Sequence, residues 1–546
     1  MLKNIFLLSL FLSCFTISQA QLLEQKKNPT RADSLRGGLR PERTNFDILK
    51  YNLAVEVNPE EKYISGKNKI HFKVLEKSQT IQLDLFENMQ IDSIVYEGKN
   101  LKYKRDFNAV FIDFPKPLAK GISTSLDFYY SGNPEIAKNP PWDGGFIFTK
   151  DKNGKDWVSV AVQGTGASLW YPNKDHQSDK PEEAEIHVTV PKGLKNISNG
   201  KFIGKEELAN GKTTWSWKVS YPINTYNLVL NIGDYKHFSD EFEGIDLDYY
   251  VLPYHLEKAK KHFKEVKDML ACFNEKFGEY PFKNDGYKLI ETPFLGMEHQ
   301  SAVAYGNQFK RGYDGNDISG SGIGLKFDFI IIHESAHEWF GNSITASDIA
   351  DMWIHESFTS YAEAVYVECK WGKQDALKYL NGLRKTRIEN KNPIIGEYHV
   401  HREDSADMYY KGANMLHTIR TVINNDKKWW KILKDFNEKF KYKTTNAEEV
   451  ISFFDQQTEV NLKPIFEQYL KFSKIPELQF KKDKGEIFYR WEADVVNFEM
   501  PINIGINRKT KRIFPTKYWQ VLEEKTDLRK ISTDQINNYI DFRVFK

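Results

Sequence analysis

In the first half of the chain, hydrophobic and polar positions alternate with a period of two residues. Between residues 46 and 240, apolar residues such as Ile81, Leu83 and Leu85 alternate with polar ones, and Gly, Pro and Asn residues separate the short runs. This period is typical of half-buried β-strands joined by turns. The pattern predicts an N-terminal antiparallel β domain over residues 45–243.

The period then changes to that of amphipathic helices. Helical spacing covers residues 256–277, 325–340 and 356–371, and further helical runs continue to residue 472. We therefore expect a mostly helical domain over residues 244–473.

A β pattern returns after Pro476. Short alternating runs cover residues 487–491, 501–507 and 519–522. They predict a small β-sandwich-like domain over residues 474–546. The predicted fold class is therefore multidomain α+β, with two β domains on either side of a helical one.

Charge and composition exclude several classes of protein. The chain has 546 residues, with 77 Lys and Arg against 75 Asp and Glu, so no sign of charge dominates the surface, and we expect no nucleic-acid partner. Hydrophobic residues make up 40% and charged residues 28%, as in packed globular proteins. Three cysteines are too few for a disulfide scaffold.

The N-terminus has the pattern of a secretory signal peptide. Lys3 precedes an apolar run over residues 5–17. The triplet Ser18, Gln19 and Ala20 follows it, with small residues at its first and third positions. We expect a signal peptide over residues 1–20, a linker over 21–44, and an exported protein in the periplasm or outside the cell. The apolar run is shorter than the roughly 20 residues of a spanning helix, and no later run approaches that length, so no integral membrane span is expected.

Two other interpretations of this terminus remain open: a buried N-terminal helix, and lipid attachment at Cys14. Without Cys14, an exported chain retains Cys272 and Cys369, both in helical patterns. These two thiols either pair or pack as core residues, and the sequence does not decide between them.

The most informative segment is a His-Glu-x-x-His motif, formed by His333, Glu334 and His337. On a helix, at 100° per residue, the two imidazoles project from one face and the carboxylate lies on the adjoining side. Zinc in catalytic sites prefers two such imidazoles and a carboxylate. Glu356, with eighteen residues between it and His337, is the candidate for that third ligand. The alternative is a helix with two solvated or core histidines.

Glu363 is a candidate for supporting this site from outside the ligand set. It follows Glu356 by seven residues, about two helical turns, and projects on nearly the same face. A carboxylate there can accept a hydrogen bond from a ligand imidazole. Its alternative is an exposed helix glutamate.

The sequence around the motif resembles a known family. Residues 333–345 read HESAHEWFGNSIT and residues 351–358 read DMWIHESF, as in the zinc aminopeptidases related to aminopeptidase N, a gluzincin family. Residues 295–299 read LGMEH where that family has Gly-Ala-Met-Glu-Asn, and residues 409–412 match its Tyr-x-Lys-Gly. Gln163, ahead of Trp170-Tyr171-Pro172, resembles the family's substrate-facing glutamine segment.

This resemblance implies a thermolysin-like catalytic domain that binds one Zn²⁺ per chain. The implied activity is release of N-terminal amino acids from peptides with a free N-terminus, by attack of a zinc-bound water on the first peptide bond. The implied residue roles are zinc ligation by His333, His337 and Glu356, general base catalysis by Glu334, oxyanion stabilisation by Tyr409, amine recognition by Glu298, and further substrate contacts from Gln163, Gly296 and Met297. Tyr410 is expected to be structural.

Two residues depart from the family pattern. Leu295 replaces its first Gly and His299 replaces its Asn, both beside Glu298. Exopeptidase specificity is therefore a weaker expectation than zinc hydrolysis. The alternatives are a zinc endopeptidase, which has no ammonium to pair, and a catalytically silent peptide-binding protein of the same fold. His299 and His355 are not expected to be ligands, because adjacent residues diverge in direction.

Many relatives continue into a large C-terminal helical domain that covers the active site, so we expect a more open cleft here. The sequence leaves the preferred N-terminal residue, the physiological peptide and the oligomeric state undetermined.

Overall fold

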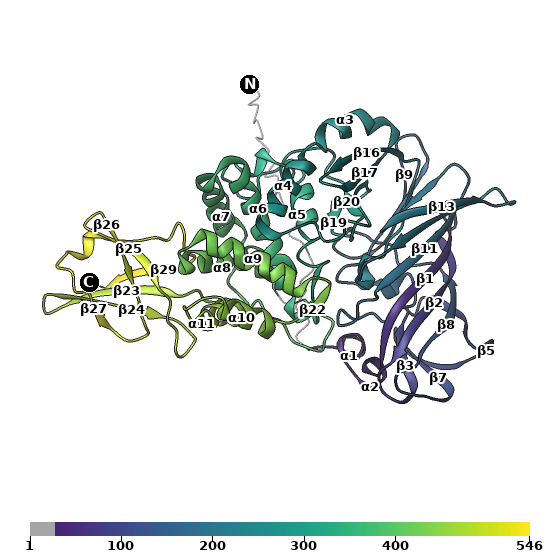
Figure 1. The fold of residues 1–546 in the computed structure, drawn as a ribbon, viewed down its shortest axis with the longest axis horizontal. Helices are drawn as coiled ribbons and strands as arrows, with labels where there is room; N and C mark the ends of the chain where they lie inside the picture. The colour runs from purple at the N-terminus through teal and green to yellow at the C-terminus, as the bar shows by residue number, and fades with distance from the viewer. Residues whose placement is uncertain (1–27, 404, 546) are drawn as a thin grey trace, which may run out of the picture.

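The computed structural model describes residues 28–403 and 405–545. The predicted signal peptide and Cys14 lie outside the described residues. Three regions follow one another along the long axis of the molecule: a β domain at the right of Figure 1, a helical domain in the middle and a small β domain at the left. The predicted multidomain α+β fold is thereby confirmed.

The N-terminal β domain is built on a sheet of eight strands. In spatial order they are β13 (Lys201–Glu207), β14 (Thr213–Val219), β11 (Glu183–Val190), β1 (Phe46–Asn58), β2 (Tyr63–Val74), β8 (Ser123–Gly132), β4 (Met89–Tyr96) and β5 (Lys99–Asn100). Buried and partly exposed residues alternate along β1, as its sequence pattern predicts. One strand pairing differs from the antiparallel prediction. Strands β1 and β11 run parallel, which requires a long connection between them.

Two smaller sheets complete this domain. One contains β12 (Lys195–Ile197), β15 (Asn231–Gly233), β10 (Asp156–Ala161) and β9 (Gly145–Lys150), and the other contains β3 (Ser78–Asp84), β7 (Ala109–Leu118) and β6 (Lys102–Asp106).

The segment predicted as a linker forms two short helices, α1 (Arg31–Gly37) and α2 (Pro41–Thr44). We call residues 28–45 the N-terminal segment. Thr30 begins α1 with a capping box, since its side chain and that of Asp33 each bond the other's backbone amide. Arg43 is fully buried and pairs with the equally buried Asp84 of the β domain. The N-terminal segment is therefore packed structure, which the sequence pattern did not indicate.

A five-stranded sheet connects the β domain to the helices. Its strands are β16 (Lys236–Phe242), β17 (Ile245–Val251), β18 (Tyr287–Glu291), β20 (Val303–Tyr305) and β19 (Gly296–Met297). The β16–β17 hairpin spans the boundary predicted at residue 243, so this sheet has strands on both sides of it. The short strand β19 lies at the sheet edge, where it contacts α5.

Between residues 256 and 471, the described part of the chain forms nine α-helices. They are α3 (Leu256–His262), α4 (Glu265–Phe277), α5 (Phe329–Ala336), α6 (Trp353–Trp371), α7 (Lys373–Arg387), α8 (Asp407–Ile423), α9 (Asp426–Phe440), α10 (Ala447–Gln456) and α11 (Lys463–Lys471). Strands β21 (Ile344–Ala346) and β22 (Lys443–Thr445) pair beside them. Within the described ranges, no helix is both long and apolar enough to cross a membrane.

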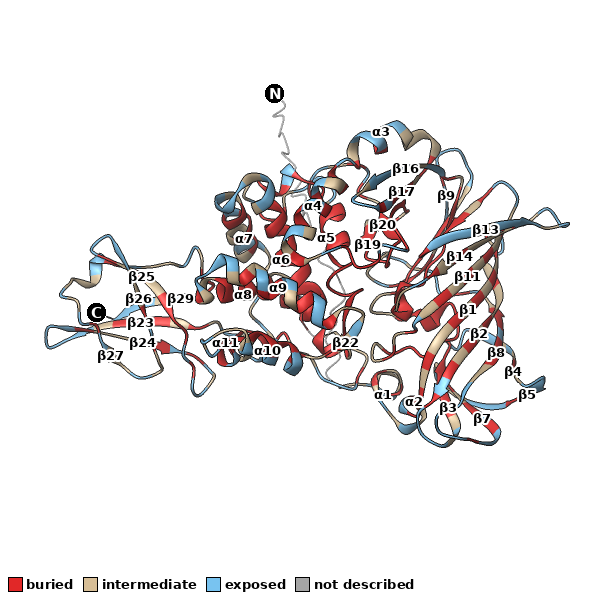
Figure 2. Cartoon of the chain, viewed as in Figure 1, coloured by how far each residue is buried: buried red, intermediate tan, exposed pale blue. Residues whose placement is uncertain are grey.

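Helix α6 is the centre of this domain. It is buried from Trp353 to Val367, and Figure 2 shows the buried residues concentrated in α5 and α6. Helix α8 packs closely on it at Gly412, where an added Cβ would lie 1.7 Å from Ser357 Oγ. A glycine is required there because the two backbones approach so closely.

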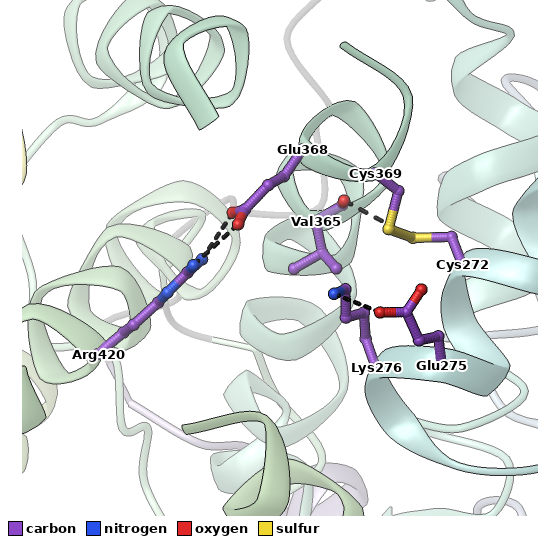
Figure 3. Close-up of a disulfide and its surroundings, with 7 residues drawn as sticks. All are labelled: Cys272, Glu275, Lys276, Val365, Glu368, Cys369 and Arg420. Carbon is purple, nitrogen blue, oxygen red and sulfur yellow. Dashed lines mark hydrogen bonds and ion pairs between the residues drawn. A yellow bond between two sulfur atoms is a disulfide. The ribbon is translucent and has the colours of Figure 1, made fainter. Parts of the chain in front are cut away.

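A disulfide joins two helices of this domain. Cys272 of α4 and Cys369 of α6 are bonded, with Cα atoms 6.0 Å apart (Figure 3). The pairing that the sequence left open is thus present in the structure. Beside it, Arg420 of α8 makes a two-pronged ion pair with Glu368 of α6, at 2.6 and 2.8 Å.

The C-terminal domain contains two sheets that share one core. The first contains β27 (Gln520–Val521), β24 (Glu486–Glu492), β23 (Glu477–Asp483) and β29 (Asp541–Phe545), and the second contains β26 (Lys509–Ile513), β25 (Ile502–Ile506) and β28 (Ile531–Thr533). Phe480 and Trp491 of the first sheet and Ile504 of the second are buried in this core. The arrangement is the small sandwich-like domain expected from the sequence.

Candidate metal centre

Helix α5 carries the first half of the site. Asp328 caps its start, since its side chain accepts hydrogen bonds from the amides of Ile330 and Ile331. The helix ends at Ala336 with His337 as its C-cap residue, so it is shorter than the sequence pattern indicates. His333 and His337 lie one turn apart at this end, and both are buried.

Helix α6 brings a third candidate ligand to the two histidines. Glu356 Oε2 lies 3.7 Å from His333 Nε2 and 3.6 Å from His337 Nε2. Tetrahedral zinc, with bonds of about 2.0–2.2 Å, holds its ligand atoms about 3.3–3.6 Å apart, so the spacing fits. Glu356 Oε2 is buried and has no hydrogen-bond partner among the described residues. A buried carboxylate oxygen without a partner is costly unless an ion completes it.

Hydrogen bonds behind the histidines orient their rings. His333 Nδ1 lies 2.7 Å from Glu363 Oε1, and Glu363 accepts a second bond from the Tyr379 hydroxyl at 2.7 Å. His337 Nδ1 lies 2.9 Å from the carbonyl oxygen of Phe340. With the proton on Nδ1, each Nε2 lone pair faces Glu356, which is the form that binds a metal. Glu363 therefore lies within hydrogen-bond distance of a candidate ligand imidazole.

Two further carboxylates lie beside the three candidate ligands. One ligand atom each from Glu298, Glu334 and His337 lies within 4.8 Å of the others. Burial raises the pKa of Glu334 to about 7. Burial, and then the negative charge of Glu356, raises the pKa of Glu298 well above its usual range. Glu298 therefore lacks a cationic partner in the described residues.

Strand β19 lies directly against this part of α5. An added Cβ at Gly296 would lie 2.6 Å from Ile330 Cγ2 and 3.0 Å from Glu334 Oε1, so a larger residue would displace the Glu334 carboxylate. Met297 is buried in a small cluster with Phe294. Gly296 therefore lines the side of the site that carries Glu334, while Met297 packs in the adjoining cluster.

The side chain of Glu298 is held by the β domain. Its Oε1 accepts hydrogen bonds from Gln163 Nε2 at 2.6 Å and from the Tyr226 hydroxyl at 3.1 Å. Its backbone carbonyl accepts one from Asn342 Nδ2 at 2.7 Å. The structure thus brings Gln163 into contact with Glu298 across 135 residues of sequence.

Tyr409 and Tyr410 lie in the first turn of helix α8 and have different surroundings. The Tyr409 ring lies nearly parallel to that of His333, with centroids 6.3 Å apart. Burial, and then Glu356, raises the pKa of Tyr409, whereas the carboxylate with the largest effect on Tyr410 is Glu363. Tyr409 is therefore the tyrosine that faces the candidate ligands.

The two histidines beside the site lie outside the candidate ligand set. His355 Nε2 accepts a hydrogen bond from the amide of Ala346 at 2.8 Å, and His299 is buried with neither ring nitrogen bonded within the part of the chain that is described. Sequence reasoning missed the contacts of Tyr226 and Asn342 with Glu298. It also missed Glu403, whose Oε2 is buried without a partner near Glu356. Glu403 lies six residues before Tyr409, and that proximity was the one available signal.

Two family models match the chain. The Peptidase M1 N-terminal domain matches residues 48–227, and the Peptidase family M1 domain matches residues 261–469. Together they cover well over half of the sequence. The second match contains both α5 and α6, and the first contains Gln163 and Tyr226.

Several curated relatives are named as aminopeptidases. The "Probable aminopeptidase 1" of Saccharolobus solfataricus is 25% identical over 395 residues, which are 70% of this chain and 47% of the relative. The "Leucyl aminopeptidase" of the same organism is 22% identical over 522 residues, 91% of this chain and 63% of the relative. The chain therefore spans about half to two thirds of the length of these relatives.

Solved structures share the fold. The M1 zinc metallopeptidase of Deinococcus radiodurans is 20% identical, with a TM-score of 0.65 over 79% of this chain and 95% of that one. A mutant of that enzyme bound to a Tyr-Ser-Ala substrate aligns with a TM-score of 0.64, also at 20% identity and with the same shares of both chains. From the two domain matches and this shared architecture, we conclude that the chain belongs to the M1 peptidase family.

Proposed function

We propose that the protein is an exported zinc aminopeptidase that removes N-terminal residues from peptides. The observation that carries this proposal is the position of Glu298, a buried carboxylate within 4.8 Å of ligand atoms of Glu334 and His337. An enzyme that removes the first residue must bind a charged α-amine next to the bond it cleaves. A buried ammonium requires a carboxylate partner, and Glu298 supplies one.

His333, His337 and Glu356 would hold the zinc. When bound, Zn²⁺ acts as a Lewis acid and supplies a hydroxide nucleophile from water near neutral pH. The unpartnered Glu356 Oε2 and the two oriented imidazoles support this assignment.

Glu334 is proposed as the general base. It is not needed as a ligand, and burial raises its pKa to about 7, a value at which a carboxylate both accepts and returns protons at neutral pH. Its carboxylate takes a proton from the attacking water and passes it to the departing amine.

Tyr409 is proposed to stabilise the oxyanion that forms at the substrate's carbonyl oxygen. A phenol donates a hydrogen bond without carrying charge, and the ring of Tyr409 lies beside His333. Glu298 and Gln163 bind the ammonium group, while Gly296 and Met297 form the adjoining wall. Neither a zinc endopeptidase nor a silent binding protein needs this combination.

Export is proposed from the predicted signal peptide together with the disulfide. Disulfides persist in oxidising compartments such as the periplasm or the extracellular space and are rare in the cytosol. The bond between Cys272 and Cys369 supports this placement.

The proposal is tested by metal analysis and hydrolysis of aminoacyl anilides. We expect about one zinc per chain, loss of hydrolysis after chelation, and cleavage of substrates with a free but not an acetylated amine. Glu334→Gln should keep its zinc and its melting temperature while turnover falls at least a hundredfold. Full activity without zinc, or equal cleavage of acetylated substrates, would overturn the proposal.

A further inference from the structure

A pocket lies beside Glu298, between segments far apart in the sequence. The space in it that the centres of water-sized molecules can reach is about 40 Å³, which is room for about three waters. We call it the Glu403 pocket. Its lining includes Gly37, Gln163, His176, Tyr226, His401 and Glu403.

The pocket begins at the position proposed for the substrate's amine. Gln163 and Tyr226 line it, and both donate hydrogen bonds to Glu298 Oε1. In a peptide, the carbon that bears the α-amine also bears the first side chain. A substrate whose ammonium lies against Glu298 therefore places its first side chain at the mouth of this pocket.

The N-terminal segment forms one wall of the pocket. The amide of His401 donates to the carbonyl oxygen of Asp33 at 3.2 Å, and Arg36 forms an ion pair with Asp175 at 3.2 Å. An added Cβ at Gly37 would lie 2.3 Å from the carbonyl carbon of Val400. This wall lies before residue 48, where the family match begins, so it is not part of what the family model describes.

Most polar groups of the pocket are already satisfied. Asp175 is paired with Arg36 and accepts two bonds from Ser168, and Asp348 accepts the amides of Ala350 and His399. His176 Nε2 bonds the carbonyl oxygen of Gly37 at 3.1 Å, and His401 Nε2 bonds that of Gly164 at 2.7 Å. These groups connect the pocket walls to one another.

Two lining side chains are exceptions among the described residues, Gln177 and Glu403, and the only acidic one of the two is Glu403. Its Oε2 is buried and has no hydrogen-bond partner within the described ranges. Burial, followed by the charge of Glu356, raises the pKa of Glu403 to about 7. Burial also lowers the pKa of His176 to about 3 and that of His401 to about 4, so neither imidazole carries a compensating charge at neutral pH. As far as the structure describes the chain, the pocket therefore contains an acidic group without a cationic partner.

We propose that the Glu403 pocket receives the side chain of the substrate's first residue, and that Glu403 selects a cationic side chain, that of lysine or arginine. This inference rests on the aminopeptidase function proposed above. A guanidinium or ammonium group in the pocket would pair with Glu403 and supply the donors that its Oε2 lacks. A neutral side chain of the same shape would leave the carboxylate buried and unpaired.

The test compares two substrates that have the same shape and differ in charge. Arginyl and citrullyl 4-nitroanilides carry the same free amine, and only the first has a cationic side chain. We expect kcat/KM for the arginyl substrate to be about 10- to 100-fold higher, as for a charge-assisted contact. Glu403→Gln should lower this ratio at least tenfold, and Glu403→Lys should invert it.

A matched control separates the pocket from general electrostatics. Glu389 is exposed and lies outside the pocket lining, so Glu389→Gln removes the same charge and should keep the wild-type ratio. A ratio near one in the wild type, or a ratio that Glu403→Gln does not change, would overturn the inference while leaving the aminopeptidase proposal intact.

Binding measurements test the pocket independently of turnover. Calorimetric titration with L-arginine and with L-citrulline should give tighter binding of arginine to the wild type, and Glu403→Gln should remove the difference. Equal affinities in the wild type would overturn the inference. If no aminoacyl anilide is hydrolysed, the proposed function fails, and this titration still decides whether the pocket selects a cation.

Discussion

Replacing Glu298 with alanine tests the proposed amine site at its most specific contact. In the structure its Oε1 accepts bonds from Gln163 and Tyr226, and no described side chain gives it a cation. The substrate's ammonium would be that cation. Removing one partner of a buried ion pair costs about 3–5 kcal/mol, because the other charge remains desolvated and unpaired. At 1.4 kcal/mol per factor of ten, this predicts a fall in kcat/KM of about a hundredfold to a few thousandfold.

The loss should be divided between KM and kcat. Without its anchor, the first residue binds more weakly, and its carbonyl is also placed less accurately relative to the candidate metal ligands and Glu334. The assay is hydrolysis of leucyl 4-nitroanilide and of its acetylated form, for the wild type, Glu298→Ala and Glu298→Asp. Glu298→Asp keeps the charge and should recover part of the loss.

Zinc content and melting temperature serve as controls for the fold of each variant. The acetylated substrate has no ammonium, so its slow hydrolysis should change little in Glu298→Ala. An equal fall for free and acetylated substrates would mean that Glu298 acts through the structure of the site. An unchanged kcat/KM for the free substrate would refute the amine assignment.

Three further perturbations have defined outcomes. Tyr409→Phe should lower kcat about a hundredfold, and Tyr410→Phe less than tenfold; the reverse ranking, measured by steady-state kinetics, would transfer the oxyanion role to Tyr410. Reducing the Cys272–Cys369 bond should lower the free energy of unfolding by about 2–5 kcal/mol, because the two cysteines are 97 residues apart in the sequence. Urea titrations measure this change, and a Cys272→Ser/Cys369→Ser double variant should be insensitive to reductant. The hydrogen bond from Arg420 lowers the pKa of Asp426 to about 2. The stabilisation that Asp426 contributes is therefore fully present above its unfolded pKa of about 4 and is lost as the pH falls toward 2. Asp426→Asn should flatten the plot of unfolding free energy against pH over that window.

The metal centre could be predicted because its geometry is mostly local. Two histidines four residues apart on a helix share a face whatever surrounds them, and Glu356 and Glu363 are related in the same way by two turns of α6. The one long-range requirement is that α5 and α6 pack together. The spacing between the two motifs indicated this packing only through its resemblance to a known family.

The rest of the site depends on contacts that no local pattern encodes. Gln163 reaches Glu298 across 135 residues, and Glu403 lies in a loop without periodicity. The N-terminal segment overlaps the linker expected over residues 21–44. Its packing depends on the buried pair of Arg43 and Asp84, which only tertiary structure brings together.

The backbone conformation explains why leucine is tolerated at position 295, where the family pattern has glycine. Leu295 is not among the residues with a positive φ angle, so its conformation suits any L-amino acid. Its carbonyl oxygen accepts a bond from the amide of Gly306 at 2.7 Å. The steric requirement for glycine falls instead on Gly296, whose Cα faces the Glu334 carboxylate. The motif therefore retains its glycine at the position where a Cβ would disturb the proposed base.

The second departure, His299, leaves the support of Glu298 intact. The carbonyl of Glu298 is held by Asn342 and its carboxylate by Gln163 and Tyr226, so the described structure assigns none of these bonds to His299. Burial lowers the pKa of His299 to about 3, so the ring is neutral and adds no positive charge that would compete with a substrate's ammonium. Glu298 thus keeps both its position and a carboxyl group that has no cationic partner in the described structure. Because amine recognition depends on those two properties, neither departure weakens the aminopeptidase proposal.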